Sequence, residues 1–358
     1  MSVNADTDMD ALFEIEAPPP VSLADRFGVP PFSIFDRRSG HWQDRKRRWL
    51  SLGIESEVGR QSNMLRHSSS TKDPQFYDKK TAAEAAAGRP LSTAEFLAEH
   101  YDPDSTTQRY LSGTSIFDPV VCELAYRWFT APGWDVLDPF AGGSVRGITA
   151  ALLDRRYTGI DLRPEQIAAN EAQVGIVPDG LPKPQWIAGD SLVEVPALPR
   201  EYEADLIFTC PPYADLEQSS DDPRDLSNMR YPQFLDLQTE IMGHAADRLR
   251  DNRFVVWVTS DVRDGRSVGN AYYGLVADTI TRAAGLGLAL YNDIIILDNV
   301  GSGAMRGGRQ MVMSRKMVRM HQHMLVFCNG DGIAAARDLN EAGAGVGEAI
   351  ETADGEAL

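Results

Sequence analysis

The chain has 358 residues, of which 43% are hydrophobic and 24% are charged, and its formal net charge is −17. These are ordinary globular proportions, and no stretch approaches the roughly 20 apolar residues that span a bilayer. The acidic N-terminus lacks the basic-then-apolar pattern of a secretory signal, and the three cysteines are too widely spaced for a disulfide framework or a zinc site. We therefore expect a cytoplasmic protein with reduced thiols, no metal and no membrane partner.

Composition divides the chain into four parts. The ends, 1–20 and 332–358, are acidic, rich in Ala, Gly and Pro and poor in large apolar residues, which is typical of disordered tails. Residues 21–104 form a polar accessory segment whose few aromatic side chains are hardly enough for a core of their own. The main domain is therefore expected at 105–331.

From about residue 115 the pattern alternates between strands and helices. The first helix begins after Asp118, its expected N-cap, with Pro119 at the first helical position. The strands that follow are expected at 134–138, 157–160, 185–187, 205–209, 254–259, 288–297 and 324–327. The helices between them are expected at 145–153, 164–173, 231–249 and 271–284. This alternation predicts a doubly wound α/β fold with a mostly parallel seven-stranded sheet, and the last two strands, with no helix between them, predict an antiparallel edge strand.

A glycine-rich turn and two further acidic strand ends indicate a ligand crevice. The turn joins the first strand to its helix and consists of Asp138, Pro139, Phe140, Ala141, Gly142, Gly143 and Ser144. In open α/β sheets ligands bind beyond the carboxyl ends of the strands, where glycines let the backbone approach them. Asp161 ends the second strand, where its carboxylate can accept hydrogen bonds from both hydroxyls of a ribose. Asp190, followed by Ser191, ends the third strand and can accept a hydrogen bond from an adenine amine.

Turn residues of this kind are common by themselves, but three acidic strand ends in register favour a nucleoside ligand. A dinucleotide is the rival ligand. The Gly-x-Gly-x-x-Gly pattern is absent, however, and Asp138 ahead of the glycines would repel a pyrophosphate. It could instead contact an ammonium such as that of S-adenosylmethionine.

The fourth strand ends in Cys210, Pro211, Pro212 and Tyr213. Two prolines make the loop rigid and leave its carbonyls directed outward, so that they can accept the hydrogens of an exocyclic base amine. Tyr213 could stack on a base that has been flipped out of a duplex. Alone such a loop is ordinary, but one strand beyond a cofactor crevice it indicates a catalytic loop.

Together, Asp138-Pro139-Phe140 with Gly142-Gly143, Gly159-Ile160-Asp161 and Pro211-Pro212-Tyr213 resemble the DNA amino-methyltransferases that modify adenine N6 or cytosine N4. Within that family the chain looks like the phage and prophage branch of DNA modification methylases, and the resemblance covers about 115–330. It implies a Rossmann-like methyltransferase domain at 105–331, acting on DNA in a bacterium or a phage-infected host, as a monomer or homodimer. It also implies a site for S-adenosylmethionine that includes Asp118, Asp138, Pro139, Phe140, Gly142, Gly143, Asp161, Asp190 and Ser191. The target amine would be held by Cys210–Tyr213.

Cys210 departs from the family, which has Asp, Asn or Ser before the two prolines. A thiol is a weak hydrogen-bond partner, so polarisation of the amine would depend more on the Pro211 carbonyl. Three alternatives stay open: cytosine C5 modification with Cys210 as nucleophile, RNA base methylation, and an inactive DNA-binding protein of the same fold.

Basic residues concentrate in two segments of this acidic chain. The segment 301–323 has no acidic residue and is expected to be a flexible loop that binds DNA phosphates through Arg306, Arg309, Arg315, Lys316 and Arg319. The other segment, 37–48, is interleaved with Trp42 and borders Trp49, and a solvated helix face and a DNA contact explain it equally well. The net charge itself neither proves nor excludes a DNA partner.

Overall fold

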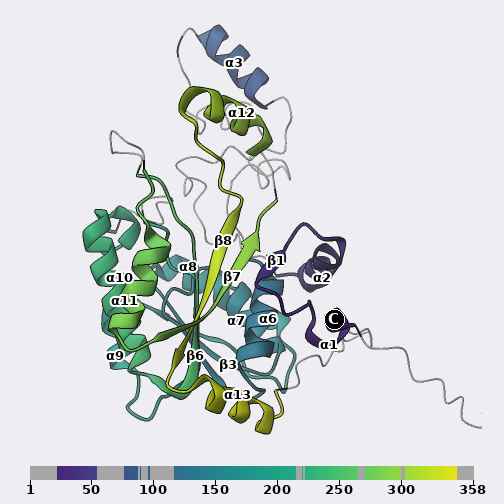
Figure 1. Cartoon of the computed structure of the whole chain (residues 1–358), viewed down its shortest axis with the longest axis vertical. Coiled ribbons are helices and arrows are strands. Elements are labelled where there is room, and N and C mark those ends of the chain that lie inside the picture. The colour runs from purple at the N-terminus through teal and green to yellow at the C-terminus, as the bar shows by residue number, and fades with distance from the viewer. Residues whose placement is uncertain are drawn as a thin grey trace, which may run out of the picture.

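A computed structural model (Figure 1) describes residues 22–54, 76–87, 89, 96, 117–214, 220, 222–264, 271–299 and 303–344. The expected N-terminal tail 1–20 lies outside the described residues, as does 345–358 of the expected C-terminal tail. The strands are β1 (Ile34–Asp36), β2 (Asp135–Asp138), β3 (Arg156–Asp161), β4 (Gln185–Ala188), β5 (Ala204–Thr209), β6 (Leu249–Thr259), β7 (Ala289–Leu297) and β8 (His321–Asn329). They form one sheet in the order β1-β7-β8-β6-β5-β2-β3-β4.

The predicted α/β fold with a mostly parallel sheet is confirmed, with two differences in detail. The sheet has eight strands because β1, from the N-terminal segment, pairs parallel with β7. The antiparallel strand is β8, and it lies one place further in than expected, between β6 and β7. Direct return from β7 to β8 without a crossover makes β8 antiparallel to both of its neighbours.

Helices cover both faces of the sheet (Figure 1). One face carries α6 (Pro119–Phe129) and α7 (Val145–Leu152), and the other carries α9 (Ser191–Ala197), α10 (Tyr231–Ala246) and α11 (Leu275–Gly285). Between β3 and β4 lies α8 (Pro164–Glu171). All six residues of the central strand β5 are buried, as expected for a parallel strand covered on both sides. Two apolar cores, one on each side of the sheet, therefore hold the carboxyl ends of the strands in fixed register.

The N-terminal segment is part of this fold, so the described part of the expected accessory segment is not separate. It contains α1 (Leu23–Phe27), β1 and α2 (Gly40–Ser51). Phe35, Trp42 and Trp49 are buried in the same apolar core as α6. Side chains too few for their own core thus complete the core of the main domain. A further helix, α3 (Phe76–Ala87), belongs to the same sequence segment.

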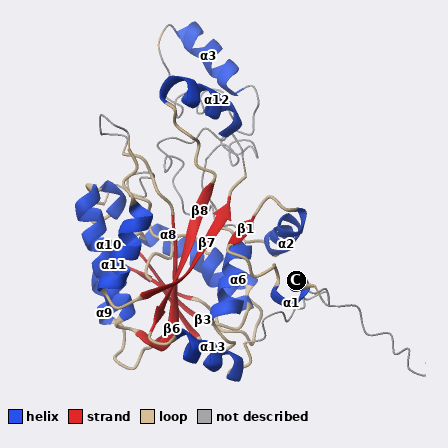
Figure 2. Cartoon of the chain, in the orientation of Figure 1, coloured by secondary structure: helices blue, strands red, loops and turns tan. Residues whose placement is uncertain are grey.

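Two segments expected to lack structure are helical. The first is α12 (Gly303–Ser314), which Figure 2 shows beyond the ends of β7 and β8, away from the helices that cover the sheet. The second is α13 (Gly332–Glu341), within the expected C-terminal tail. It begins at Asp331, which accepts the Ile333 and Ala334 amides at 2.8 and 3.3 Å, and it buries Leu339. Capping and burial of a small apolar face order a segment whose composition suggested disorder. Among the described residues no helix is both long and apolar enough to cross a membrane.

Candidate active site

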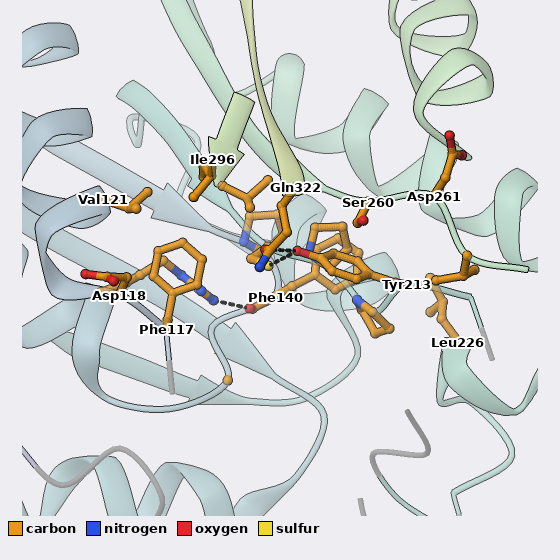
Figure 3. A pocket seen from close by; sticks show the side chains of 18 of the residues that line it. Phe117, Asp118, Val121, Phe140, Tyr213, Leu226, Ser260, Asp261, Ile296 and Gln322 are labelled. Atoms are coloured by element: carbon orange, nitrogen blue, oxygen red, sulfur yellow. Dashed lines mark hydrogen bonds between the residues drawn. The ribbon is translucent and has the colours of Figure 1, made fainter. Parts of the chain in front are cut away.

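A cavity of about 620 Å³ opens where the parallel strands end, and it is lined by both predicted groups of site residues (Figure 3). From the glycine-rich turn and the ends of β3 and β4 come Pro139, Phe140, Gly142, Asp161, Asp190 and Ser191. From the end of β5 come Cys210, Pro211, Pro212 and Tyr213. The antiparallel β8 begins at the same edge, so that Gln322 also faces the cavity. The structure thus brings together the two groups of residues that the sequence predicted to bind a cofactor and to act in catalysis.

Asp138 holds the glycine-rich turn together from inside. It is fully buried and does not line the cavity. Its carboxylate accepts hydrogen bonds from Thr209 Oγ1 at 2.6 Å, Tyr157 OH at 2.7 Å and Arg146 Nε at 2.5 Å, and from the Phe140 amide at 3.1 Å. These four donors occupy both carboxylate oxygens, so the expected contact between Asp138 and a ligand ammonium does not fit this geometry. Gly143, also assigned to the cofactor, is likewise buried outside the cavity lining.

Arg146, at the start of α7, clamps the same turn and was missed by sequence reasoning. It donates to the carbonyls of Phe140 at 2.6 Å and Ala141 at 2.9 Å as well as to Asp138. Burial alone would lower the pKa of Arg146, but the Asp138 carboxylate raises it overall, so the guanidinium stays charged. The Cζ atom of Arg146 lies 4.8 Å from the ring centroid of Phe117, another cavity-lining side chain. The sequence does hold a signal for this role: Arg146 is a charged residue in the apolar helix that follows the strand ending at Asp138.

Asp161 and Asp190 remain on the cavity wall, partly exposed. Asp161 accepts the Gly142 amide and the Arg163 amide, both at 3.0 Å. Gly142 has a φ of +51°, a conformation that L side chains rarely adopt, which explains the glycine at this point of the turn. Asp190 caps α9 by accepting the Leu192 amide at 3.0 Å. Backbone hydrogen bonds therefore fix both carboxylates at the cavity wall.

The cavity wall between these two aspartates can hold a nucleoside. Its apolar side chains come from Phe140, Ile160 and Leu162, and its volume lies within the usual range for small-ligand sites. Arg163 Nη1 is buried at the same wall and has no hydrogen-bond partner among the described residues. Two carboxylate acceptors, a glycine backbone without a side chain and an apolar surface together fit a ribose and an adenine ring. Ser191 donates to the Pro139 carbonyl at 2.5 Å and so supports the turn.

The Pro-Pro-Tyr loop is held by a side-chain contact across the cavity. The Tyr213 hydroxyl donates to Gln322 Oε1 at 3.0 Å, and it lies 3.3 Å from Cys210 Sγ (Figure 3). Pro211 is buried, whereas Cys210, Pro212 and Tyr213 are partly exposed to the cavity. The loop that follows, expected to help in base recognition, is outside the described residues at 215–219 and at 221.

Asp118 lines the cavity, but its carboxylate is engaged by the N-terminal segment. Oδ2 accepts from Arg37 Nε at 2.9 Å, Lys46 Nζ at 3.2 Å and Trp42 Nε1 at 3.3 Å. Oδ1 caps α6 through the Val120 amide at 3.1 Å. The predicted cofactor contact by Asp118 therefore competes with four internal donors, and its evident role is to anchor α2 against α6.

The described residues of the basic segment 301–323 are divided between the cavity and the protein surface. Arg319 lines the cavity and lies 3.6 Å from Asp261, whereas Arg309 and Arg315 are exposed on and just after α12. Lys316 is half-buried, and the side chain of Arg306 lies outside the described residues. Among the described residues no group of His, Cys, Asp and Glu could hold a metal ion. Of the five residues predicted to contact DNA, four have described side chains, and one of these, Arg319, lines the cavity.

No protein-family model and no curated protein sequence matches the chain. Solved structures that resemble it include TrmN from Thermus thermophilus, at 17% identity and a TM-score of 0.40, over 60% of this chain and 49% of that one. A methyltransferase from Pyrococcus furiosus has 14% identity and a TM-score of 0.38, over 73% and 100%. Magnesium protoporphyrin IX methyltransferase from Synechocystis, solved with bound S-adenosylmethionine, has 12% identity and a TM-score of 0.39, over 70% and 96%. The matched region spans about half the length of the TrmN chain.

Proposed function

We propose that this chain transfers a methyl group from S-adenosylmethionine to an exocyclic amine of a base in DNA. One observation supports this most strongly: the glycine-rich turn with Asp161 and Asp190 and the rigid Pro211-Pro212 loop line a single cavity. A nucleoside site and an acceptor for a planar amine are then adjacent, as methyl transfer between them requires. The resemblance of these motifs to DNA amino-methyltransferases points the same way.

On the cofactor side, Asp161 would accept hydrogen bonds from the ribose hydroxyls, and Asp190 would accept one from the adenine amine. When bound, S-adenosylmethionine supplies a methyl group made electrophilic by its sulfonium. The backbone at Gly142, held by Asn170 Nδ2 at 2.8 Å from its carbonyl, lets the ligand approach closely. Because Asp138 is internal, its place in this scheme is to keep the turn in shape through Arg146.

On the target side, the Pro211 carbonyl would accept one hydrogen of the amine and raise the electron density on its nitrogen. Tyr213 offers an aromatic face to the base, and burial of Pro211 keeps the loop rigid. A base in a duplex reaches such a cavity only after it is flipped out. These residues orient the amine and exclude water from it, and the cysteine at 210 need not act as a nucleophile.

The charge beside the cavity supports a nucleic-acid substrate, and the resemblance of the motifs to DNA amino-methyltransferases favours DNA over RNA. We name residues 303–319 the outer basic segment; it contains five Arg or Lys residues, and no acidic residue occurs from 299 to 330. In a chain with a net charge of −17, this is a local concentration of basic residues, and Gln310, Met317 and Arg319 of the segment line the cavity. Phosphates flanking a flipped nucleotide would meet Arg309, Arg315 and Lys316, while Arg319 lies at the cavity.

Nucleoside mass spectrometry tests the proposal. DNA and RNA are each incubated with the protein and methyl-labelled S-adenosylmethionine, then digested and analysed. We expect label in N6-methyladenine or N4-methylcytosine from DNA, and none with the Asp161→Ala variant. Label in C5-methylcytosine would assign Cys210 as a nucleophile instead, and label in RNA alone would overturn the DNA substrate. If no nucleic acid is labelled although the cofactor binds, methyl transfer to a base is wrong.

A further inference from the structure

We propose that a hydrogen-bond chain from the N-terminal segment fixes the direction of the bond between Cys210 and Tyr213, making the thiol the donor. The chain runs from Arg37 through Asp298 and Gln322 to Tyr213 and ends at Cys210. Its consequence for turnover rests on the proposed function, whereas its direction follows from the contacts alone. Gln322 is thereby a positioning residue of the candidate active site.

The first step fixes the amide of Gln322. Asp298 accepts from Arg37 Nη1 at 2.8 Å, and its two oxygens lie 3.1 and 3.3 Å from Gln322 Nε2. A carboxylate paired with an arginine can accept hydrogen bonds but cannot donate them. Gln322 must therefore turn its NH₂ group towards Asp298, which settles an orientation that the two similar amide ends would otherwise leave open.

The second step follows from the other end of the same amide. Gln322 Oε1 faces the Tyr213 hydroxyl at 3.0 Å and can only accept, so the single phenolic hydrogen is directed to Gln322 (Figure 3). Cys210 Sγ lies 3.3 Å from the same hydroxyl oxygen. With its hydrogen already used, that oxygen accepts, and the thiol hydrogen must supply the bond.

A thiol that donates is stabilised in its protonated form, because the bond is lost when the proton leaves. Cys210 is thus kept as a thiol beside the target, which opposes its use as a nucleophile and agrees with methylation of an amine. The N-terminal segment has a direct part in this. Arg37, between β1 and α2, is held by Asp118 at 2.9 Å as well as by Asp298, so packing of α2 is linked to the polarity of the catalytic loop.

Other charges act on Cys210 and must stay constant in a test. Arg146 interacts with it electrostatically from α7 and is itself paired with Asp138. Among the described residues, the other charged or titratable side chains that line the cavity are Arg37, Asp118, Asp161, Arg163, Asp190, Arg224, Asp225, Asp261, Arg263, Tyr272, Asp298, Arg319 and His321. Substitution at Gln322 removes none of them, so a changed titration of Cys210 reports the hydrogen-bond direction.

The direct test is the pH dependence of Cys210 alkylation. Iodoacetamide labelling is followed by peptide mass spectrometry, which separates Cys210 from the buried Cys122 and Cys328. In Gln322→Leu the Tyr213 hydroxyl becomes able to donate to the sulfur, which favours the thiolate. We expect the midpoint of the rate profile to fall by about one pH unit, roughly tenfold faster labelling below the midpoint. The plateau rate at high pH serves as the control for accessibility. An unchanged or higher midpoint overturns the inference.

A matched pair of variants provides a rescue test. Gln322→Glu alone places two carboxylates together, and we expect a loss of turnover of about tenfold or more with little change in KM for the cofactor. Gln322→Glu with Asp298→Asn restores a donor facing an acceptor, keeps the total charge, and still offers the Tyr213 hydroxyl an acceptor. We expect this double variant to recover most of the turnover and the wild-type alkylation midpoint. If the double variant turns over no faster than Gln322→Glu alone, the proposed series of hydrogen bonds is wrong. If wild-type protein methylates nothing, the proposed function fails. The alkylation midpoints would still show whether the Cys210 thiol donates its hydrogen to Tyr213.

Discussion

The two basic segments of this acidic chain look alike in sequence and have opposite environments in the structure. In the first, Arg45 donates to Glu123 at 2.7 Å, and Lys46 and Arg37 pair with Asp118 at 3.2 and 2.9 Å. Both of these acids lie in or at the start of α6 and are buried. In the outer basic segment, Arg319 lies 3.6 Å from Asp261, but Arg309 and Arg315 are exposed and have no acidic partner among the described residues. They lie beside the highly exposed Met313 and Met317.

The difference shows that a cluster of basic residues reveals a partner only when its acids are known. Asp118 and Glu123 lie more than seventy residues from the basic residues of the first segment with which they pair. Charge in the first segment therefore stabilises packing of α2 on α6, while charge in the outer segment is free to attract phosphates. Four variants test this contrast.

The largest effect is expected for Glu123→Leu. Glu123 is fully buried and accepts from Arg45 Nε at 2.7 Å and Trp49 Nε1 at 2.8 Å. Its removal leaves Arg45, Trp49 and also Arg127, which pairs with Glu123 at 3.1 Å, against an apolar side chain. We expect this to lower the free energy of unfolding by about 3–5 kcal/mol. Urea denaturation followed by circular dichroism measures this. Glu171→Leu, at the exposed end of α8, is the matched control. If both variants unfold alike, the ion pairs of the first segment contribute nothing.

Arg309→Gln with Arg315→Gln is expected to weaken DNA binding by about one to two orders of magnitude near physiological salt. Both side chains are exposed, and two fewer phosphate contacts would reduce the salt dependence of the affinity by a slope of about 1.8. Fluorescence anisotropy over a salt series gives both quantities. The free energy of unfolding should change by less than about 0.5 kcal/mol. An unaltered salt slope would remove the outer segment from the DNA interface.

Arg37→Gln lies between the two cases because Arg37 contacts both α6 and the cavity. Its side chain is 19% exposed, so its pairs with Asp118 and Asp298 are only partly screened by solvent. We expect a loss of about 1–2 kcal/mol of unfolding free energy, together with slower turnover, because Asp298 then holds Gln322 less firmly. DNA affinity should be unchanged. Lower DNA affinity at full stability would place Arg37 in the DNA interface instead.

The smallest effect is expected for Arg47→Ala. Its side chain is 70% exposed and, among the residues that the structure describes, pairs only with Asp44, itself 56% exposed, within the same helix. Such a pair contributes less than about 0.5 kcal/mol, and the residue faces away from the ion pairs that anchor α2. Stability and DNA affinity should both match wild type. A tenfold weaker DNA complex would show that the first segment binds DNA after all.

The sequence was most informative where the pattern is local. Alternating apolar stretches located all seven predicted strands to within a few residues, and acids at consecutive strand ends predicted that Asp161 and Asp190 share one cavity with Tyr213. These inferences succeed because parallel strands bring their carboxyl ends to one edge wherever the connecting helices lie.

Long-range contacts could not be predicted in the same way. The pair between Arg37 and Asp298 spans 261 positions, and the place of β1 beside β7 depends on it and on shared apolar burial. Asp138 looked like a ligand contact because its internal donors Arg146, Tyr157 and Thr209 come from three other elements. Only packing distinguishes an aspartate that faces the ligand from one that holds the turn.

Calorimetric titration of the purified protein with S-adenosylmethionine tests most directly whether the cavity is a methyl-donor site. We predict saturable binding with one molecule per chain, weakened tenfold or more by Asp161→Ala, because that variant removes the carboxylate expected to accept the ribose hydroxyls. No heat of binding to folded wild-type protein, or equal affinity in the Asp161→Ala variant, would contradict a cofactor site at the ends of β2, β3 and β4.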